Sequence, residues 1–276
     1  MSAEKAGLLP PFFVCAQRET GKLSIRVTLT FHFQSVRNVE FITLYYIKES
    51  MENILLKISI MLVPALLAIT CHEVSHGYIA DRLGDNTARY MGRLTLNPLK
   101  HLDIIGTLMV FIVGIGWAKP VPVNFNNLRN PKKDMIWVAL AGPVTNVTLA
   151  LFSALALRGL AAAGEGMLAG TPAMIALDPI LLMLAFSVYI NLLLAIFNLI
   201  PVPPLDGGRV LTGLLPYRQA LIFSRIEPYG MIIIILLVFF TNIFSYILLP
   251  ILNVGIRILA GPESALIYKV TSFLMR

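Results

Sequence analysis

The chain has 276 residues, of which 57% are hydrophobic and only 13% are charged. Soluble domains are typically about 45–50% apolar and about 25% charged, so this composition argues against an ordinary soluble protein and against intrinsic disorder. The net charge of +7 comes from basic residues that lie mostly between apolar runs. That pattern is typical of loops facing an anionic membrane leaflet and gives no indication of nucleic-acid binding.

The first 50 residues differ from the rest of the chain. They hold six Lys or Arg residues and four Glu residues, which fit neither a membrane segment nor a signal peptide. Residues 23–33 alternate like a β-strand, but no second strand-like run accompanies them. We predict that residues 1–50 are a poorly ordered N-terminal extension or arise from an upstream start codon. Residues 51–276 then form the membrane-embedded domain.

Long apolar runs dominate the chain after residue 53. A membrane-spanning helix needs about 20 apolar residues, so a run of 14 residues at 104–117 is too short for a comfortable span. We interpret that run as a short strand-like or re-entrant element. The prediction is an all-α polytopic membrane protein with four to six transmembrane helices, built from the runs at 54–71, 135–157, 180–200, 231–240 and 243–259.

The distribution of basic residues predicts the orientation in the membrane. Lys and Arg cluster in the connections at 81–103, 119–133 and 203–229, whereas the connection after residue 157 has only Arg158. Because cytoplasmic loops carry an excess of Lys and Arg, the three basic connections are expected in the cytoplasm. The first membrane helix therefore ends on the cytoplasmic side. This orientation puts residues 1–50 outside, although they are basic.

The first long apolar run leads into His72-Glu73-Val74-Ser75-His76. Two histidines four residues apart lie on one face of a helix, one turn apart, and can bind one zinc ion. The intervening Glu73 would be close enough to act on water at that site. The alternative is a few polar residues near a helix end. Ionisable groups are costly at membrane depth, so three of them within five positions favour a functional site.

A two-histidine zinc site needs a third protein ligand, and Asp206 is the best candidate. It follows a long apolar run and the sequence Pro203-Pro204-Leu205, which breaks the helix. Two glycines follow it and allow a close approach of the backbone. The alternative interpretation is that Asp206 caps a helix at 209–215.

These residues resemble the site-2 protease family of intramembrane zinc metalloproteases. The similarity rests on the two motifs above, with Asn198 and Pro201 preceding Asp206, and extends over about residues 51–215. It also includes the segments 92–103, 116–124 and 141–146. It does not include residues 1–50 and is vague after Tyr217. No connection is long enough to hold a PDZ-like module or a regulatory domain, so the resemblance is to a compact form of the family.

The resemblance implies a role for each matching residue. His72, His76 and Asp206 would bind Zn²⁺, although such a ligand set also accepts iron or cobalt. Glu73 would be the catalytic base that takes a proton from water and gives it to the leaving amine. Asn146 would bind the substrate backbone or an oxyanion. The alternative for Asn146 is a polar contact between packed helices.

The function that the resemblance implies is a zinc-dependent intramembrane endopeptidase that cleaves transmembrane segments of other membrane proteins. Its partners would be transmembrane protein substrates and the lipid bilayer, with no nucleic acid. We expect a multi-pass cell-membrane protein whose active site lies toward the cytoplasm. Two alternatives stay open: a membrane metal transporter, and a proteolytically inactive relative that acts as a binding scaffold.

Overall fold

A computed structural model describes residues 16–19, 22–25, 33–106, 108, 116–167 and 172–274. Contacts divide the chain into two compact units, Met1–Ile54 and Leu55–Arg276. In the first unit, β1 (Ala16–Glu19) pairs with β2 (Lys22–Ile25) as an antiparallel hairpin. The expectation that no second strand accompanies residues 23–33 is therefore wrong. The sequence of β1 has no apolar alternation by which it could be recognised.

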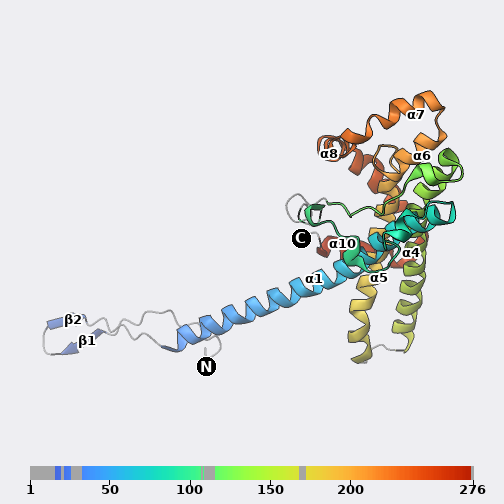
Figure 1. The fold of residues 1–276 in the computed structure, drawn as a ribbon. Helices are drawn as coiled ribbons and strands as arrows, with labels where there is room; N and C mark the ends of the chain where they lie inside the picture. Colours follow the sequence, from blue (N-terminus) through green and yellow to red (C-terminus); the bar gives the residue numbers. More distant parts are fainter. Residues whose placement is uncertain are drawn as a thin grey trace. The chain divides into compact units, whose positions relative to one another are not determined.

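Helix α1 (Phe33–Arg82), labelled in Figure 1, contains the His-Glu-x-x-His motif near its C-terminal end. The helix ends at Arg82, two residues before Gly84. Gly84 has a φ of +116°, which is accessible to glycine at low cost. The N–H of Asp85 then bonds to the carbonyl of Ala80 at 2.9 Å, so the last turn is closed on itself.

The membrane architecture agrees with the predicted all-α polytopic class. Within the described part of the chain, five helical segments are long and apolar enough to cross a bilayer. This number lies inside the predicted range of four to six. The segments are Ile54–Arg82, Pro131–Ala163, Leu177–Asn198, Tyr217–Phe240 and Phe244–Leu274.

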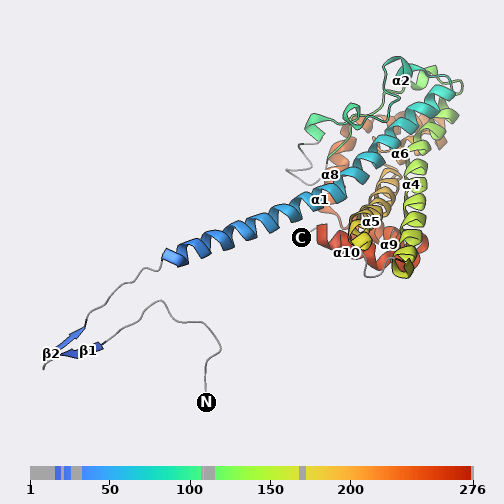
Figure 2. The same cartoon turned by 90° about the horizontal axis from the view of Figure 1, so that it is seen from below.

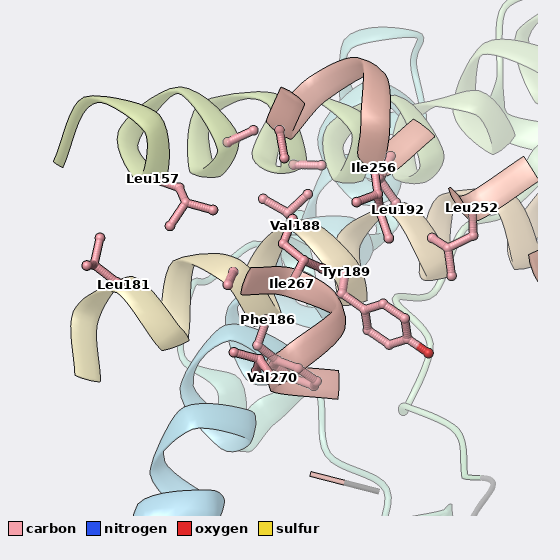
Figure 3. Close-up of a cluster of buried hydrophobic side chains, with 14 of the residues drawn as sticks. Leu157, Leu181, Phe186, Val188, Tyr189, Leu192, Leu252, Ile256, Ile267 and Val270 are labelled. Atoms are coloured by element: carbon pink, nitrogen blue, oxygen red, sulfur yellow. The ribbon is translucent and has the colours of Figure 1, made fainter. Parts of the chain in front are cut away.

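The apolar core lies among α4 (Pro131–Met167), α5 (Pro172–Asn198), α9 (Leu249–Ala260) and α10 (Ser264–Leu274). Figure 3 shows their buried side chains converging, among them Leu157, Val188, Leu192, Ile256 and Ile267. Many apolar side chains elsewhere on these helices are exposed, for example Phe152 and Ile258. A soluble protein does not expose so much apolar surface, and a lipid-facing protein does.

The connection between the first two membrane segments is mostly irregular. It contains the short helix α2 (Thr87–Tyr90) and the 3-10 turns η1 (Pro98–Lys100) and η2 (Phe125–Asn127). Its only regular β contact among the described residues is a single bridge between Leu102 and Ala118. Most of the predicted element at 104–117 lies outside the described residues.

The helices that follow α5 are shorter than α1, α4 and α5 (Figure 2). Helix α6 (Asp206–Leu214) packs against α4, where Gly213 lies so close to Ile136 that an added Cβ would come within 2.4 Å of its Cγ1. The chain then continues through α7 (Tyr217–Ser224), η3 (Glu227–Tyr229), α8 (Gly230–Phe240), a π-helical turn η4 (Phe244–Leu248) and, between α9 and α10, η5 (Gly261–Glu263).

Candidate active site

The three predicted metal ligands meet in one buried site. His72 and His76 lie one turn apart on α1, and Asp206 is the first residue of α6. Their ligand atoms all lie within 4.8 Å of one another. The three residues are only 7%, 8% and 6% exposed, respectively. Burying three ionisable side chains together is costly unless they share a counter-charge, and a metal cation supplies one.

The distances in this site are close to those of a tetrahedral zinc centre, and two of them are slightly shorter. The Nε2 atoms of His72 and His76 are 3.1 Å apart. Each also faces one carboxylate oxygen of Asp206, at 3.2 Å and 3.4 Å. Bonds of about 2.0–2.2 Å at tetrahedral angles put the ligand atoms of a zinc site roughly 3.3–3.6 Å apart. Among the described residues, Asp206 Oδ2 has no hydrogen-bond partner, as expected of a buried oxygen that binds a cation.

Both imidazoles are held in the tautomer that can bind a metal through Nε2. His76 Nδ1 lies 2.7 Å from the carbonyl oxygen of Val138, which can only accept, so Nδ1 carries the proton. His72 Nδ1 lies 2.6 Å from Oδ1 of Asn146 and donates to it in the same way. Metal-binding histidines typically donate their second ring N–H to such an oxygen. In the neutral rings both Nε2 atoms are therefore available to a cation, and both face the carboxylate of Asp206.

The segment that carries Asp206 folds back tightly on itself. An added Cβ on Gly207 would lie 2.2 Å from the carbonyl oxygen of Leu199, and one on Gly208 would lie 2.4 Å from the nitrogen of Pro203. Only glycine fits at both positions, which explains the glycine pair after Asp206. The residue at the N-cap of α6 is Leu205, and it makes no side-chain capping bond. The capping interpretation of Asp206 therefore does not describe this structure.

The charge state of Asp206 also suits a metal ligand. Burial by itself would raise the pKa of its carboxyl group. In their protonated form, the two facing imidazoles of His72 and His76 outweigh burial through hydrogen bonds and charge, and hold this pKa below its ordinary value. Asp206 is therefore a carboxylate at neutral pH.

Helix α4 approaches the two histidines at Gly142. A Cβ at this position would lie 2.4 Å from Cε1 of His72 and 2.5 Å from Nε2 of His76. Any side chain there would push the rings out of place. The lack of a side chain at Gly142 thus leaves the space that the two imidazole rings occupy.

Glu73 is held by the backbone of the connection between the first two membrane segments. Its Oε2 accepts a hydrogen bond from the N–H of Val121 at 2.9 Å. The side chain of Val121 packs where Gly77 leaves room, one turn after Glu73 on α1. Glu73 is not one of the three residues whose ligand atoms converge. Its carboxylate lies outside that group, and the residue is half-buried.

Asp85 fastens the same connection to the end of α1. It is fully buried and accepts hydrogen bonds from the side chain and backbone of Thr87, the backbone of Asn124 and the side chain of Asn127. Burial would raise the pKa of Asp85, but these hydrogen bonds outweigh it and hold the pKa below the ordinary value. Since Asn124 lies three residues after Val121, Asp85 limits the movement of the segment that holds Glu73.

Asn146 is completely buried on α4 and uses its whole amide group. Its Oδ1 accepts from His72, and its Nδ2 donates to the carbonyl of Ala68 at 3.3 Å and to Oδ1 of Asn191 at 2.8 Å. Both N–H groups are thus engaged, and an oxyanion would have to displace one of these acceptors. The predicted role of Asn146 in binding substrate or an oxyanion stays a prediction.

Three contributors to the site were not predicted from the sequence: the backbone N–H of Val121, the Asp85 carboxylate and Asn191. The first two depend on folding of an irregular connection, which no local pattern indicates. Asn191 does carry a usable signal, because an amide inside a 22-residue apolar segment is costly unless it is hydrogen-bonded. His101, in contrast, bonds to the carbonyl of Thr95 within the irregular connection and is not one of the converging ligand residues.

Comparisons with known proteins agree with this chemistry. The family model described as "Peptidase family M50" matches residues 165–241, which include Asp206. A protein of Bacillus subtilis (strain 168) named "Putative zinc metalloprotease YwhC" is 41% identical over 197 residues, covering 71% of this chain and 86% of the relative. "Putative zinc metalloprotease Rip2" of Mycobacterium tuberculosis (strain ATCC 25618 / H37Rv) is 31% identical over 152 residues, or 51% of this chain and 52% of the relative. No solved structure matches the chain.

The similarity to the Bacillus protein extends over most of both chains. This chain has five apolar helical segments and a buried group of two histidines and one carboxylate, as a membrane zinc protease requires. The chain belongs to peptidase family M50, the site-2 protease family, and is a membrane-embedded metalloendopeptidase with Zn²⁺ as its cofactor.

Proposed function

We propose that this protein cleaves transmembrane segments of other membrane proteins, with His72, His76 and Asp206 as the zinc ligands and Glu73 as the catalytic base. The observation that carries the proposal is the convergence of three buried ligand atoms within 4.8 Å of one another, two of them on the apolar, membrane-length helix α1 and the third on α6. A transporter or a binding scaffold would not need an acidic residue directly after a ligand histidine with its carboxylate fixed by the backbone, as Glu73 is by the N–H of Val121.

The depth of the ligands along α1 supports cleavage within the membrane. The membrane segment ends at Arg82, and a helix rises 1.5 Å per residue. His76 and His72 therefore lie about 9 and 15 Å from that end, measured along the helix axis. The hydrocarbon core is about 30 Å thick, so this site is within reach of a peptide bond inside a substrate's membrane segment.

The residues around the site divide the chemistry of peptide hydrolysis among themselves. Zinc would supply Lewis-acid polarisation of the peptide carbonyl and of water. Glu73 takes a proton from the attacking water while the water oxygen bonds to the carbonyl carbon. Glu73 then gives that proton to the amine nitrogen as the C–N bond breaks. The Val121 N–H keeps the Glu73 carboxylate in place during both transfers.

The basic connections support an active site near the cytoplasm. Arg82 ends the ligand helix, and Arg89, Arg93 and Lys100 follow it. Cytoplasmic loops carry such residues in excess. A site close to this end could draw water from the cytoplasm, and a substrate helix would have to unwind there to expose its carbonyl groups.

The test is cleavage of a single-span reporter by purified protein in proteoliposomes, with the cut bond mapped by mass spectrometry. We expect a cut inside the reporter's apolar segment that requires zinc and is lost in Glu73→Gln. Glu263→Gln, which makes the same change on the distant η5 turn, is the matched control and should cleave normally.

Two results would contradict the proposal in different ways. Equal cleavage by Glu73→Gln and the wild type would remove Glu73 from the mechanism. A zinc-dependent cut that lies only in the reporter's soluble flanks would leave the protease activity intact but would refute cleavage within the membrane.

A further inference from the structure

A line of buried amide groups leads from His72 into the interior of the helix bundle. His72 bonds to Asn146 on α4, Asn146 bonds to Asn191 on α5, and Asn191 bonds to Ser187 one turn earlier. Asn146 is 0% exposed and Asn191 is 1% exposed. The catalytic step described above does not use Asn191. This residue is nevertheless linked to the metal ligand His72 through a single intervening side chain, that of Asn146.

The hydrogen bonds in this line can run in only one direction. Asn191 Nδ2 lies 2.9 Å from the carbonyl oxygen of Ser187, and a carbonyl can only accept. This contact turns Oδ1 of Asn191 toward Asn146, whose Nδ2 must then donate to it at 2.8 Å. The oxygen of the Asn146 amide is thereby turned toward His72, so His72 Nδ1 must be the protonated nitrogen.

The orientation of the Asn146 amide decides whether His72 can bind a metal. With the oxygen facing His72, the ring carries its proton on Nδ1 and leaves the Nε2 lone pair free. With the amide reversed, an N–H group would face Nδ1, and the ring would have to protonate Nε2 to accept that bond. A protonated Nε2 cannot be a ligand. The carbonyl of Ala68, at 3.3 Å, favours the productive orientation but is a longer contact than that of Asn191.

We propose that Asn191 is a positioning residue for the zinc centre: it locks the Asn146 amide and thereby the tautomer and ring orientation of His72. The inference rests on the proposed zinc site at His72, His76 and Asp206. His76 does not depend on this line, because its Nδ1 donates directly to the backbone of Val138. The two histidines are thus held by different means, one by the backbone of α4 and one through side chains.

Asn191→Leu tests this proposal, because leucine has a similar size and removes the acceptor for Asn146. Zinc affinity, measured by competition with a chelator in detergent-solubilised protein, should fall about tenfold, at the lower end of the effect of residues that orient metal ligands. The visible absorption spectrum of the Co²⁺-substituted protein should shift, since the geometry at one ligand changes. Asn191→Asp, protonated at this buried position, keeps an oxygen facing Asn146 and an O–H that can donate to the Ser187 carbonyl, so it should retain most of the affinity.

Tyr189→Phe is the matched control, since it removes a polar atom from the same helix two residues away, outside the amide line. It should leave zinc affinity and the Co²⁺ spectrum unchanged. Wild-type affinity and spectrum in Asn191→Leu would overturn the role of Asn191 and leave the zinc site standing. Equal zinc binding by the wild type and His76→Ala would overturn the site itself, and the role of Asn191 with it.

A measurement on the wild type keeps the proposal testable if Asn191→Leu does not fold. In zinc-free protein labelled with ¹⁵N-histidine, NMR shifts report which ring nitrogen carries the proton. With the His72 signal assigned by its loss in His72→Ala, and at a pH high enough for the ring to be neutral, we expect a protonated Nδ1 and an unprotonated Nε2. The opposite tautomer for His72 would refute the inference.

Discussion

Replacing Gly142 with alanine places a methyl group directly against the histidine pair. The added Cβ would lie 2.4 Å from Cε1 of His72, 2.6 Å from its Nε2 and 2.5 Å from Nε2 of His76. Optimal contacts between such atoms are about 3.5–4.0 Å, so the rings or helix α4 must move by about 1 Å. Neither ring has a free direction, because each is also tied through Nδ1.

A displacement of this size is large for a metal site. Ligand distances are held within about 0.2 Å of their ideal values in functional centres. Misplacing reacting groups by about 1 Å can reduce a rate about 100-fold. We therefore expect Gly142→Ala to lose zinc affinity by about tenfold to 100-fold and to lose most cleavage activity.

The matched control is Gly159→Ala on the same helix, because an added Cβ there meets nothing within 4 Å. At an exposed helical position alanine stabilises the helix by up to about 1 kcal/mol relative to glycine, so this variant should keep or slightly raise the unfolding temperature. The assays are zinc content by mass spectrometry, chelator competition, reporter cleavage and thermal unfolding in detergent. Wild-type zinc affinity in a folded Gly142→Ala protein would refute the assigned packing of α4 against His72 and His76.

Three further results are expected. Chelation of zinc should abolish reporter cleavage and added Zn²⁺ should restore it, whereas His76→Ala should regain nothing at the same zinc concentration; full recovery of His76→Ala would contradict its role as a ligand. Asp85→Ala should destabilise the protein by about 1–3 kcal/mol, because it leaves buried N–H groups without an acceptor. The folded pKa of Asp85 is lowered, so its stabilising effect is complete above the unfolded pKa of about 4 and is lost as pH falls through the folded pKa. The acid denaturation curves of the wild type and Asp85→Ala should therefore converge at low pH. Cysteines placed singly at Arg129 and Arg158, in a background without native cysteines, should react with an impermeant thiol reagent from opposite sides of the membrane; labelling from the same side would refute the proposed topology.

The local parts of the site could be predicted from the sequence because they depend on helix periodicity. Two histidines at a spacing of four must share a helix face, and α1 places them so. Asp206 stood out because few acids lie near membrane-length apolar runs, and α6 brings it to the histidines. The five membrane segments follow from the length of the apolar runs in the same way.

The supporting contacts could not be predicted, because they join segments that are far apart in the chain. Val121 reaches Glu73 across 48 residues and Asn191 reaches Asn146 across 45 residues. Neither contact follows a spacing rule, since the first depends on how an irregular connection folds against α1 and the second on how α4 packs against α5. The hairpin partner Ala16–Glu19 was missed for a related reason: strand pairing is a property of two segments, and this one lacks an apolar alternation.

The ligand helix α1 exposes much of the apolar surface that precedes its motif. Leu62, Val63 and Leu67 are 50%, 56% and 51% exposed. Acyl chains therefore complete the packing of the helix that carries His72 and His76, and the surrounding lipid becomes part of the support of the metal centre. A bilayer of different thickness, or a short-chain detergent, will act on this helix sooner than on the densely packed core of α4, α5, α9 and α10. Kinetic constants of this enzyme consequently depend on the surrounding lipid or detergent, and they are comparable only when measured in the same lipid.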